Sequence, residues 1–182
     1  MEQDPITLII RTLGELFIFV LLMRFLLQLA KADYYNPISQ SIVKLTQVPL
    51  TPLQRILPKA GRMDLSPLAL ALLVKLGMIA LLIVIYKGSI QVDIISLVLR
   101  SIAGLANSIL SIYFWATLGS VIISWVAPGS YHPAPQLISQ LTEPLFKLAQ
   151  KVIPPLGGLD LSPILIFLAI QIIQGQLAPF AL

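Results

Sequence analysis

The 182-residue sequence has no cysteine, only one histidine and few charged residues. Without cysteine, the chain has no disulfide, no iron–sulfur cluster and no thiol nucleophile. His132 alone leaves little room for a histidine-based metal site or catalytic triad, and no metal-ligand spacing occurs. Charged residues make up 11% of the chain, against about 25% in an ordinary soluble domain. This scarcity excludes a soluble enzyme, a disordered chain and a nucleic-acid-binding domain, because so little charge does not cover a globule in water.

Hydrophobic residues, by contrast, make up 57% of the chain, and the mean hydropathy is +0.91. A helix needs about 20 apolar residues to cross a hydrocarbon layer of about 30 Å. Four segments meet this requirement: residues 6–30, 67–86, 102–127 and 163–180. Residues 92–101 would make the third helix too long for one span, so we interpret them as an interfacial approach. The sequence predicts an all-α membrane protein with four transmembrane helices.

The distribution of basic residues predicts the orientation of these helices. The two long connections, after the first and third spans, together carry Lys31, Lys44, Arg55, Lys59, Arg62, Lys147 and Lys151. The opposite side has at most Arg11, Lys87 and Arg100. By the positive-inside rule, both connections lie in the cytoplasm and both termini lie outside. The basic excess therefore indicates orientation and not a nucleic-acid partner.

The sequence contains an internal repeat. Residues 36–77 align without a gap with residues 132–173, at a constant offset of 96 (132 minus 36), and Asp64-Leu65-Ser66-Pro67 recurs as Asp160-Leu161-Ser162-Pro163. Each unit consists of a span, a polar connection and a second span, so both copies point the same way. The sequence predicts two parallel repeats, over residues 1–91 and 92–182.

The repeated tetrapeptide is typical of a helix start. Serine is a favoured N-cap and proline is favoured in the first turn, while a carboxylate just before them stabilises the positive end of the helix. An alternative interpretation is a site that holds an ion or a phosphate. The residues concerned are Asp64, Ser66, Pro67, Asp160, Ser162 and Pro163.

The two connections have an amphipathic pattern over residues 37–57 and 134–153. Apolar residues recur there at three- and four-residue spacing, with polar and basic residues on the other faces. This pattern predicts two helices that lie on the cytoplasmic membrane surface, next to anionic headgroups. Packing of one connection against the other is an alternative that is compatible with the first.

Two charged residues fall deep inside the predicted spans. Glu15 and Lys75 each lie about nine residues into a span, so we expect them at similar depth and in contact. At the repeat offset they correspond to Ser111 and Gln171. Both charges are thus absent together from the second copy, which favours a pair, because removing one partner leaves a buried charge. The pair is either a structural link between helices or part of the lining of an ion path.

Other polar residues lie within the spans. We expect Arg24, near the cytoplasmic end of the first span, to reach the interface or to pair with Asp64. Asn107 lies beside small residues at helical spacing on the third span: Ser101, Gly104, Ser108 and Ser111. Such residues indicate tight helix packing in lipid, or alternatively a polar lining.

The doubled motif resembles the YggT family of small integral membrane proteins. It reads LTQVPLTPLQRILPKAGRMDLSP at residues 45–67 and LTEPLFKLAQKVIPPLGGLDLSP at residues 141–163. In the family, an arginine and then Ser-Trp usually precede this motif. The first copy has Arg24 but lacks Ser-Trp, whereas the second has Ser124-Trp125 but carries Ser120 in place of the arginine. Two copies resemble the double-length proteobacterial members.

The resemblance implies a multi-pass bacterial inner-membrane protein linked to osmotic-stress resistance and potassium uptake. On this basis we expect a transport component, or a modulator of one, for potassium or osmolyte homeostasis. The alternative is a scaffold or assembly factor that binds partners through its cytoplasmic helices, because relatives resemble cytochrome-assembly factors or neighbour cell-division genes. The expected partners are the lipid bilayer and either a second copy or another membrane protein. No catalytic, cofactor-binding or metal-binding residue is expected, and we expect no enzymatic activity.

Overall fold

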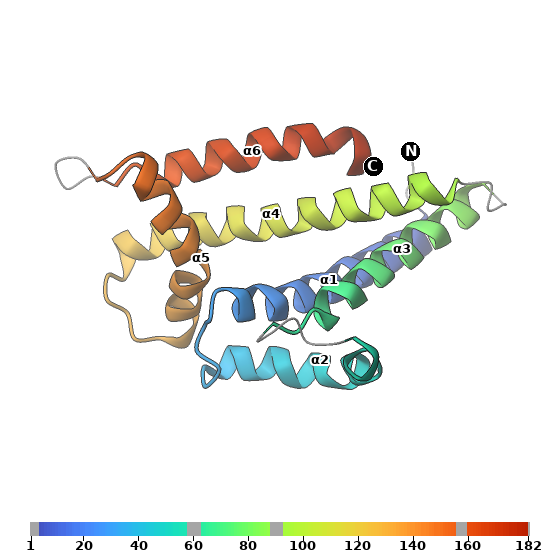
Figure 1. The fold of residues 1–182 in the computed structure, drawn as a ribbon, viewed down its shortest axis with the longest axis horizontal. Helices are drawn as coiled ribbons and strands as arrows, with labels where there is room; N and C mark the ends of the chain where they lie inside the picture. The colour runs from blue at the N-terminus through green and yellow to red at the C-terminus, as the bar shows by residue number, and fades with distance from the viewer. Residues whose placement is uncertain (1–3, 58–62, 88–92, 156–159, 182) are drawn as a thin grey trace.

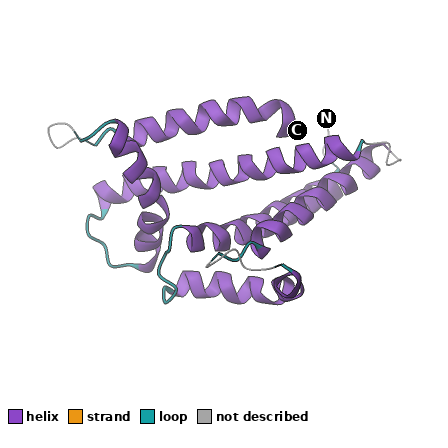
Figure 2. Cartoon of the chain, viewed as in Figure 1, coloured by secondary structure: helices purple, strands orange, loops and turns teal. Residues whose placement is uncertain are grey.

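The computed structural model describes residues 4–57, 63–87, 93–155 and 160–181. Within these ranges the chain forms six helices and no strand (Figure 2). The helices are α1 (Pro5–Leu29), α2 (Pro37–Ile56), α3 (Ser66–Lys87), α4 (Ile94–Val126), α5 (Pro133–Val152) and α6 (Ser162–Ala181). Of these, α1, α3, α4 and α6 are long and apolar enough to cross a membrane. The predicted all-α class with four spans is therefore confirmed.

The third span is longer than the sequence predicts. Helix α4 runs without a break for 33 residues from Ile94, about 50 Å at the usual rise per residue. Residues 94–101 contain neither proline nor glycine, and the Asp93 carboxylate accepts hydrogen bonds from the N–H groups of Ile95 and Ser96, both at 3.3 Å. Residues 94–101, which the sequence predicts as an interfacial approach, therefore form the first two turns of the spanning helix.

The two halves of the chain repeat one arrangement (Figure 1). In each half, two long helices run antiparallel, and an amphipathic helix connects them. Helix α5 lies across the ends of α4 and α6 that are farthest from the chain termini, whereas both termini lie at the opposite end (Figure 1). The amphipathic helices predicted for both connections are confirmed as helices. Their position on a membrane surface, and the orientation that partly rests on Lys59 and Arg62, remain predictions; Lys59 and Arg62 lie outside the described residues.

The core of the molecule is centred on the second half of α1. Ile18, Leu21, Leu22 and Leu26 are fully buried there, together with Leu50 of α2. Two leucines of α5, Leu137 and Leu141, belong to the same cluster. A second, smaller cluster in the other half joins Ala149 of α5 to Ile166 and Ile170 of α6. The connection of the second repeat thus packs on the first repeat, and together with the packing of α4 against α3 this contact joins the two halves.

Candidate functional site

Glu15 and Lys75 form an ion pair between α1 and α3. The distance between Lys75 Nζ and Glu15 Oε1 is 2.5 Å. Glu15 lies ten residues into α1 and Lys75 nine residues into α3, or about 15 and 14 Å along the two axes. Because the helices run antiparallel, these depths bring the two side chains together near the middle of the spans. The Lys75 side chain is 10% exposed and that of Glu15 is 38% exposed.

The stem of Lys75 passes against α4 at Gly104. A Cβ atom on Gly104 would lie 2.7 Å from Lys75 Cε, closer than two carbon atoms approach without a shift. Glycine therefore leaves the space that the lysine stem occupies, as the backbone comes close to the side chain. The small residue that the sequence analysis assigned to helix packing thus packs on the charged pair itself.

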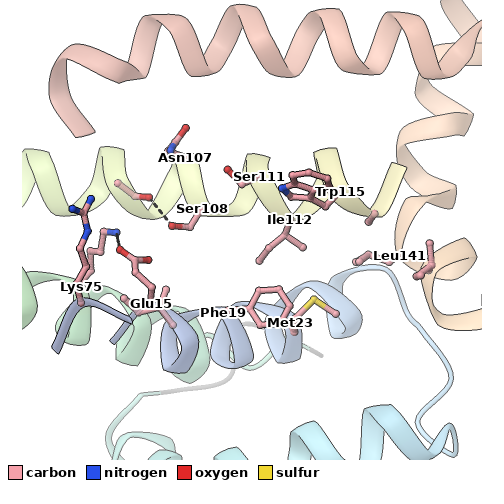
Figure 3. A pocket seen from close by; sticks show the side chains of 15 residues that line it. Glu15, Phe19, Met23, Lys75, Asn107, Ser108, Ser111, Ile112, Trp115 and Leu141 are labelled. Atoms are coloured by element: carbon pink, nitrogen blue, oxygen red, sulfur yellow. Dashed lines mark hydrogen bonds and ion pairs between the residues drawn. The ribbon is translucent and has the colours of Figure 1, made fainter. Parts of the chain in front are cut away.

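A cavity of about 660 Å³ lies next to this ion pair, between α1 and α4 (Figure 3). Its lining comes from both repeats. Polar and charged side chains line one part of it: Arg11, Glu15, Lys75, Asn107, Ser108 and Ser111. Apolar side chains line the remainder, among them Phe19, Met23 and Trp115. The structure thus groups four of the intramembrane residues singled out in the sequence, namely Glu15, Lys75, Asn107 and Ser111.

The polar residues of α4 differ in their contacts. The Ser108 hydroxyl donates to the carbonyl of Gly104 at 3.0 Å, and Ser101 donates to the carbonyl of Leu97 at 2.8 Å. Both hydroxyls are thus satisfied within their own helix. Asn107 lines the cavity, but its amide points away from the ion pair, toward the side of α6 (Figure 3).

The second repeat replaces the ion pair with a neutral hydrogen bond. Ser111, the counterpart of Glu15, accepts a hydrogen bond from Gln174 Nε2 of α6 at 3.0 Å. Gln171, the counterpart of Lys75, is exposed on the outside of α6. The sequence indicates Gln171, but Gln174, which lies one helical turn later, makes the contact. Residues three apart lie near the same helix face. The two glutamines therefore indicated that either Gln171 or Gln174 contacts Ser111.

Arg24 connects α1 to α2. Its Nη1 atom donates to the Val43 carbonyl at 3.2 Å and to Thr46 Oγ1 at 2.8 Å, and Nη2 donates to Gln47 Oε1 at 3.0 Å. Although Arg24 and Asp64 are both described, no ion pair joins them. The expected pairing with Asp64 is therefore wrong at the level of direct contact, because α2 offers three acceptors nearer to the guanidinium.

The repeated Asp-Leu-Ser-Pro segments begin α3 and α6, as the sequence predicts, but the aspartate is the capping acceptor. Asp64 Oδ1 accepts from the Ser66 N–H, and Asp160 Oδ1 from the Ser162 N–H, both at 2.9 Å. Each serine is instead the first residue of its helix, and Pro67 and Pro163 occupy the second position. The aspartate, and not the serine, is the cap. Its carboxylate lies two residues before the serine N–H and reaches forward to accept from it.

The second oxygen of each aspartate binds the end of the preceding amphipathic helix. Gln54 Nε2 donates to Asp64 Oδ2 at 2.7 Å, and Gln150 Nε2 donates to Asp160 Oδ2 at 3.1 Å. Burial favours a higher pKa for Asp64, but hydrogen bonds from Ser66 and Gln54 and the positive charge of Arg24 together lower it. The pKa of Asp160 is lowered mainly by its hydrogen bonding to Ser162. Both motifs therefore work as ionised clamps on a connection, which favours the helix-start interpretation.

Comparison with known proteins adds the ancestry of this repeat. The family model CCB3/YggT matches the chain twice, over residues 3–85 and 99–181. The chain belongs to the CCB3/YggT family. Its two family repeats start 96 residues apart (99 minus 3), which is the offset that the sequence shows. The first match covers α1, α2 and α3 up to residue 85, and the second covers α4 from residue 99 onward, α5 and α6, so the predicted internal repeat and family are confirmed.

Relatives within the family are close but have no described activity. An uncharacterized protein of Pseudomonas aeruginosa is 46% identical over 91% of this chain and 84% of its own length. The uncharacterized protein YggT of Escherichia coli is 32% identical over 97% of this chain and 90% of its own length. A shorter match, to the uncharacterized protein ycf19 of Guillardia theta, is 35% identical over 36% of this chain and 72% of that relative. No solved structure matches the chain.

These findings make the chain a multi-pass membrane protein of the YggT family. The family assignment carries no reaction, because the relatives have names and no activities. Among the described residues, no group of three histidine, cysteine, aspartate or glutamate side chains is arranged to hold a metal ion. The arrangement offers instead a charged pair on the wall of an intramembrane cavity.

Proposed function

We propose that this protein contributes to potassium or osmolyte homeostasis in the bacterial inner membrane, as a transport component or as a modulator of one. The observation that carries the proposal is the Glu15–Lys75 ion pair on the wall of the 660 Å³ cavity. A charged group inside a membrane is costly, and such groups usually line the path of an ion or a polar solute. The proposal assigns no catalytic role, cofactor or metal to the chain.

The cavity supports this role because it presents charge to a solute. The Glu15 carboxylate remains 38% exposed although it pairs with Lys75, so one side of the pair faces the cavity. Arg11 and Lys75 are the positive groups of this lining, so the exposed Glu15 carboxylate is the group that attracts a cation. Four spans do not enclose a wide pore alone, so the proposal includes a second copy or another membrane protein that completes the path. Both termini lie in the periplasm in this proposal.

The test is potassium flux into liposomes that contain the purified protein. We expect flux in the unmodified protein and its loss when Glu15→Ser and Lys75→Gln are combined, which copies the residues of the second repeat. The matched control combines Glu143→Gln and Lys147→Gln. It removes an exposed ion pair of the same charge on α5, with Lys147 Nζ 2.5 Å from Glu143 Oε1. Absence of flux at every gradient would overturn the transport role.

A scaffold or assembly role is the second candidate, and a groove on the second repeat favours it. The groove has a volume of about 400 Å³ and lies between α4, α5 and α6. Its lining is apolar and includes Leu148 and Val152 of α5, which are 59% and 70% exposed. If the liposomes show no flux and Leu148→Gln and Val152→Gln abolish a stable complex with a membrane protein, the scaffold role replaces transport.

A further inference from the structure

A second cavity lies at the other end of α1, between this helix, α2 and the start of α3. Its volume is about 830 Å³. We call it the Arg24 cavity. Its polar and charged lining consists of Arg24, Gln28, Lys31, Tyr34, Ser39, Gln47, Gln54 and Asp64. It is separate from the cavity at the Glu15–Lys75 pair, and the proposed function does not use it.

The described lining of the Arg24 cavity has a net positive charge. Asp64 is its one carboxylate, and it forms no ion pair with Arg24 or Lys31. Arg24 and Lys31 are its basic residues. The two carboxylate oxygens of Asp64 accept from Ser66 and Gln54, whereas the guanidinium of Arg24 donates to neutral acceptors on α2. An anion in the cavity therefore meets two cations and displaces no ion pair between described residues.

Ser39 is one of four buried residues whose hydroxyl has no hydrogen-bond partner among the described residues, with Ser66, Thr117 and Ser162, and of these four it alone lines the Arg24 cavity. It is only 6% exposed. A buried hydroxyl without a partner is unfavourable, so an acceptor atom in the cavity would satisfy it.

The second repeat provides a neutral counterpart of the Arg24 cavity. At the repeat offset, Ser120, Ala127 and Pro135 replace Arg24, Lys31 and Ser39, and these three residues line a cavity of about 490 Å³ at the matching place. The described residues that line it include no charged side chain. The basic pair and the free hydroxyl are thus a feature of the first repeat, although both repeats share the same helix arrangement.

The position of the Arg24 cavity indicates the source of the anion. Arg24 lies five residues before the end of α1, about 8 Å along the axis. The neighbouring helix α2 leaves Leu45, Val48 and Ile56 between 70% and 81% exposed. Such an apolar side suits a lipid surface, and the predicted position of α2 on the membrane would put the cavity at the level of the headgroups. Basic pockets at this depth suit phosphate groups.

We propose that the Arg24 cavity binds the phosphate group of an anionic phospholipid from the leaflet that α2 contacts. Arg24 and Lys31 supply the positive charge, and the Ser39 hydroxyl donates a hydrogen bond to a phosphate oxygen. The acyl chains leave the cavity toward the hydrocarbon layer. The second repeat has no equivalent lipid site, because it lacks both cations.

The test measures lipid adducts by native mass spectrometry and thermal unfolding of the full chain in detergent. The probes are short-chain phosphatidylglycerol, short-chain phosphatidylcholine and inorganic phosphate. We expect phosphatidylglycerol to bind and to raise the unfolding temperature. Lys31→Ala and Arg24→Ser, which copy the second repeat, each weaken this binding about tenfold, the usual effect of one charged hydrogen bond. Ser39→Ala weakens it less.

The matched control is Lys44→Ala, which removes an exposed lysine of α2 outside the cavity lining and leaves the affinity unchanged. If Arg24→Ser does not fold, the exposed Lys31 decides the result alone. The proposal is overturned if Lys31→Ala binds like the unmodified protein, or if phosphatidylcholine binds as tightly as phosphatidylglycerol. Binding of inorganic phosphate with the affinity of phosphatidylglycerol would overturn the lipid as the source.

Discussion

The two repeats of this chain have the same order of helices, but they differ in the charge that they carry inside the spans. The first contains the Glu15–Lys75 pair and Arg24. The second has the neutral residues Ser111, Gln171 and Ser120 at the matching places, and Ser111 bonds Gln174 instead. The clamp between each amphipathic helix and the next span is present in both, through Gln54–Asp64 and Gln150–Asp160. The clamps are therefore kept in both copies, whereas the Glu15–Lys75 pair and Arg24 are specific to the first.

This difference is explained by the cost of an unpaired charge, because of which both members of an ion pair are present in one repeat and both are absent from the other. A buried ion pair is not required for stability, because neutral residues of similar size replace both partners at little cost. Losing one partner alone leaves a charge without compensation. The second repeat thus shows that the helix arrangement does not need the charges, which favours a role in binding or passage for the copy that has them.

The largest expected effect concerns the common direction of the repeats and is all-or-none. Because the chain has no cysteine, single cysteines report position without background. Lys44→Cys on α2 and Lys147→Cys on α5 are exposed positions, and we expect both to be shielded from an impermeant thiol reagent in intact cells. Phe180→Cys near the C-terminus reacts. Opposite labelling of positions 44 and 147 would show that the repeats do not share one orientation.

The next effect is the cost of separating the charges of the first repeat. Lys75→Gln alone and Glu15→Ser alone each lower the free energy of unfolding in detergent by about 3–5 kcal/mol, because each leaves a charge unpaired. The combined variant, which copies the second repeat, recovers much of this loss. The measurement is a double-mutant cycle by thermal unfolding. Additive losses would mean that the two residues do not interact in solution.

A smaller effect follows from the close contact between Gly104 and Lys75. Gly104→Ala places a methyl group against the lysine stem and is expected to cost about 1–3 kcal/mol through overpacking. Gly77→Ala on α3 is the matched control, since no heavy atom lies within 4 Å of its added Cβ. In the Lys75→Gln background the cost of Gly104→Ala decreases. If the cost of Gly104→Ala is unchanged in the Lys75→Gln background, the strain does not come from the lysine stem.

The smallest effect compares the two aspartate clamps. Gln54→Ala and Gln150→Ala are each expected to cost about 0.5–1.5 kcal/mol, the usual value of one hydrogen bond. The pKa values of Asp64 and Asp160 are lowered in the folded protein, so their contribution is complete above the unfolded pKa of about 3.9 and is lost as the pH falls through the folded pKa values. Unfolding curves below pH 5 check this. Asp64→Asn and Asp160→Asn should flatten the pH dependence.

The fold was largely predictable because it depends on local signals. The bounds of α1, α3 and α6 follow from hydropathy and from helix-start residues, and each predicted edge lies within one residue of the observed edge. The start of α4 was missed, because hydropathy does not distinguish an interfacial segment from the first turns of a long, tilted span. The aspartate caps were assigned to serine because both residue types are favoured at a helix start.

The candidate site was predictable only in part. The depth of Glu15 and Lys75 indicated their contact. Each lies about halfway along its span, counted from opposite faces of the membrane, so both fall near the midplane. The partners of Arg24 were missed because they lie on α2. How closely α2 packs on α1 depends on tertiary contacts and not on the sequence of either helix alone. Gln174 was missed for a related reason, because repeat alignment fixes the position in the sequence but not the rotation of α6.

The sequence by itself determined the membrane class, the four spans, the repeat and the depth of each charged residue, because these properties depend on neighbours within one helix. Only the tertiary structure decided which polar side chains meet. Successive residues of a helix lie about 100° apart, so a rotation of the helix by the angle of one or two residues exchanges a buried face for an exposed one. The packing of α5 on α1 and the fit of Gly104 to Lys75 fix those rotations, and with them the two cavities on which both proposals rest.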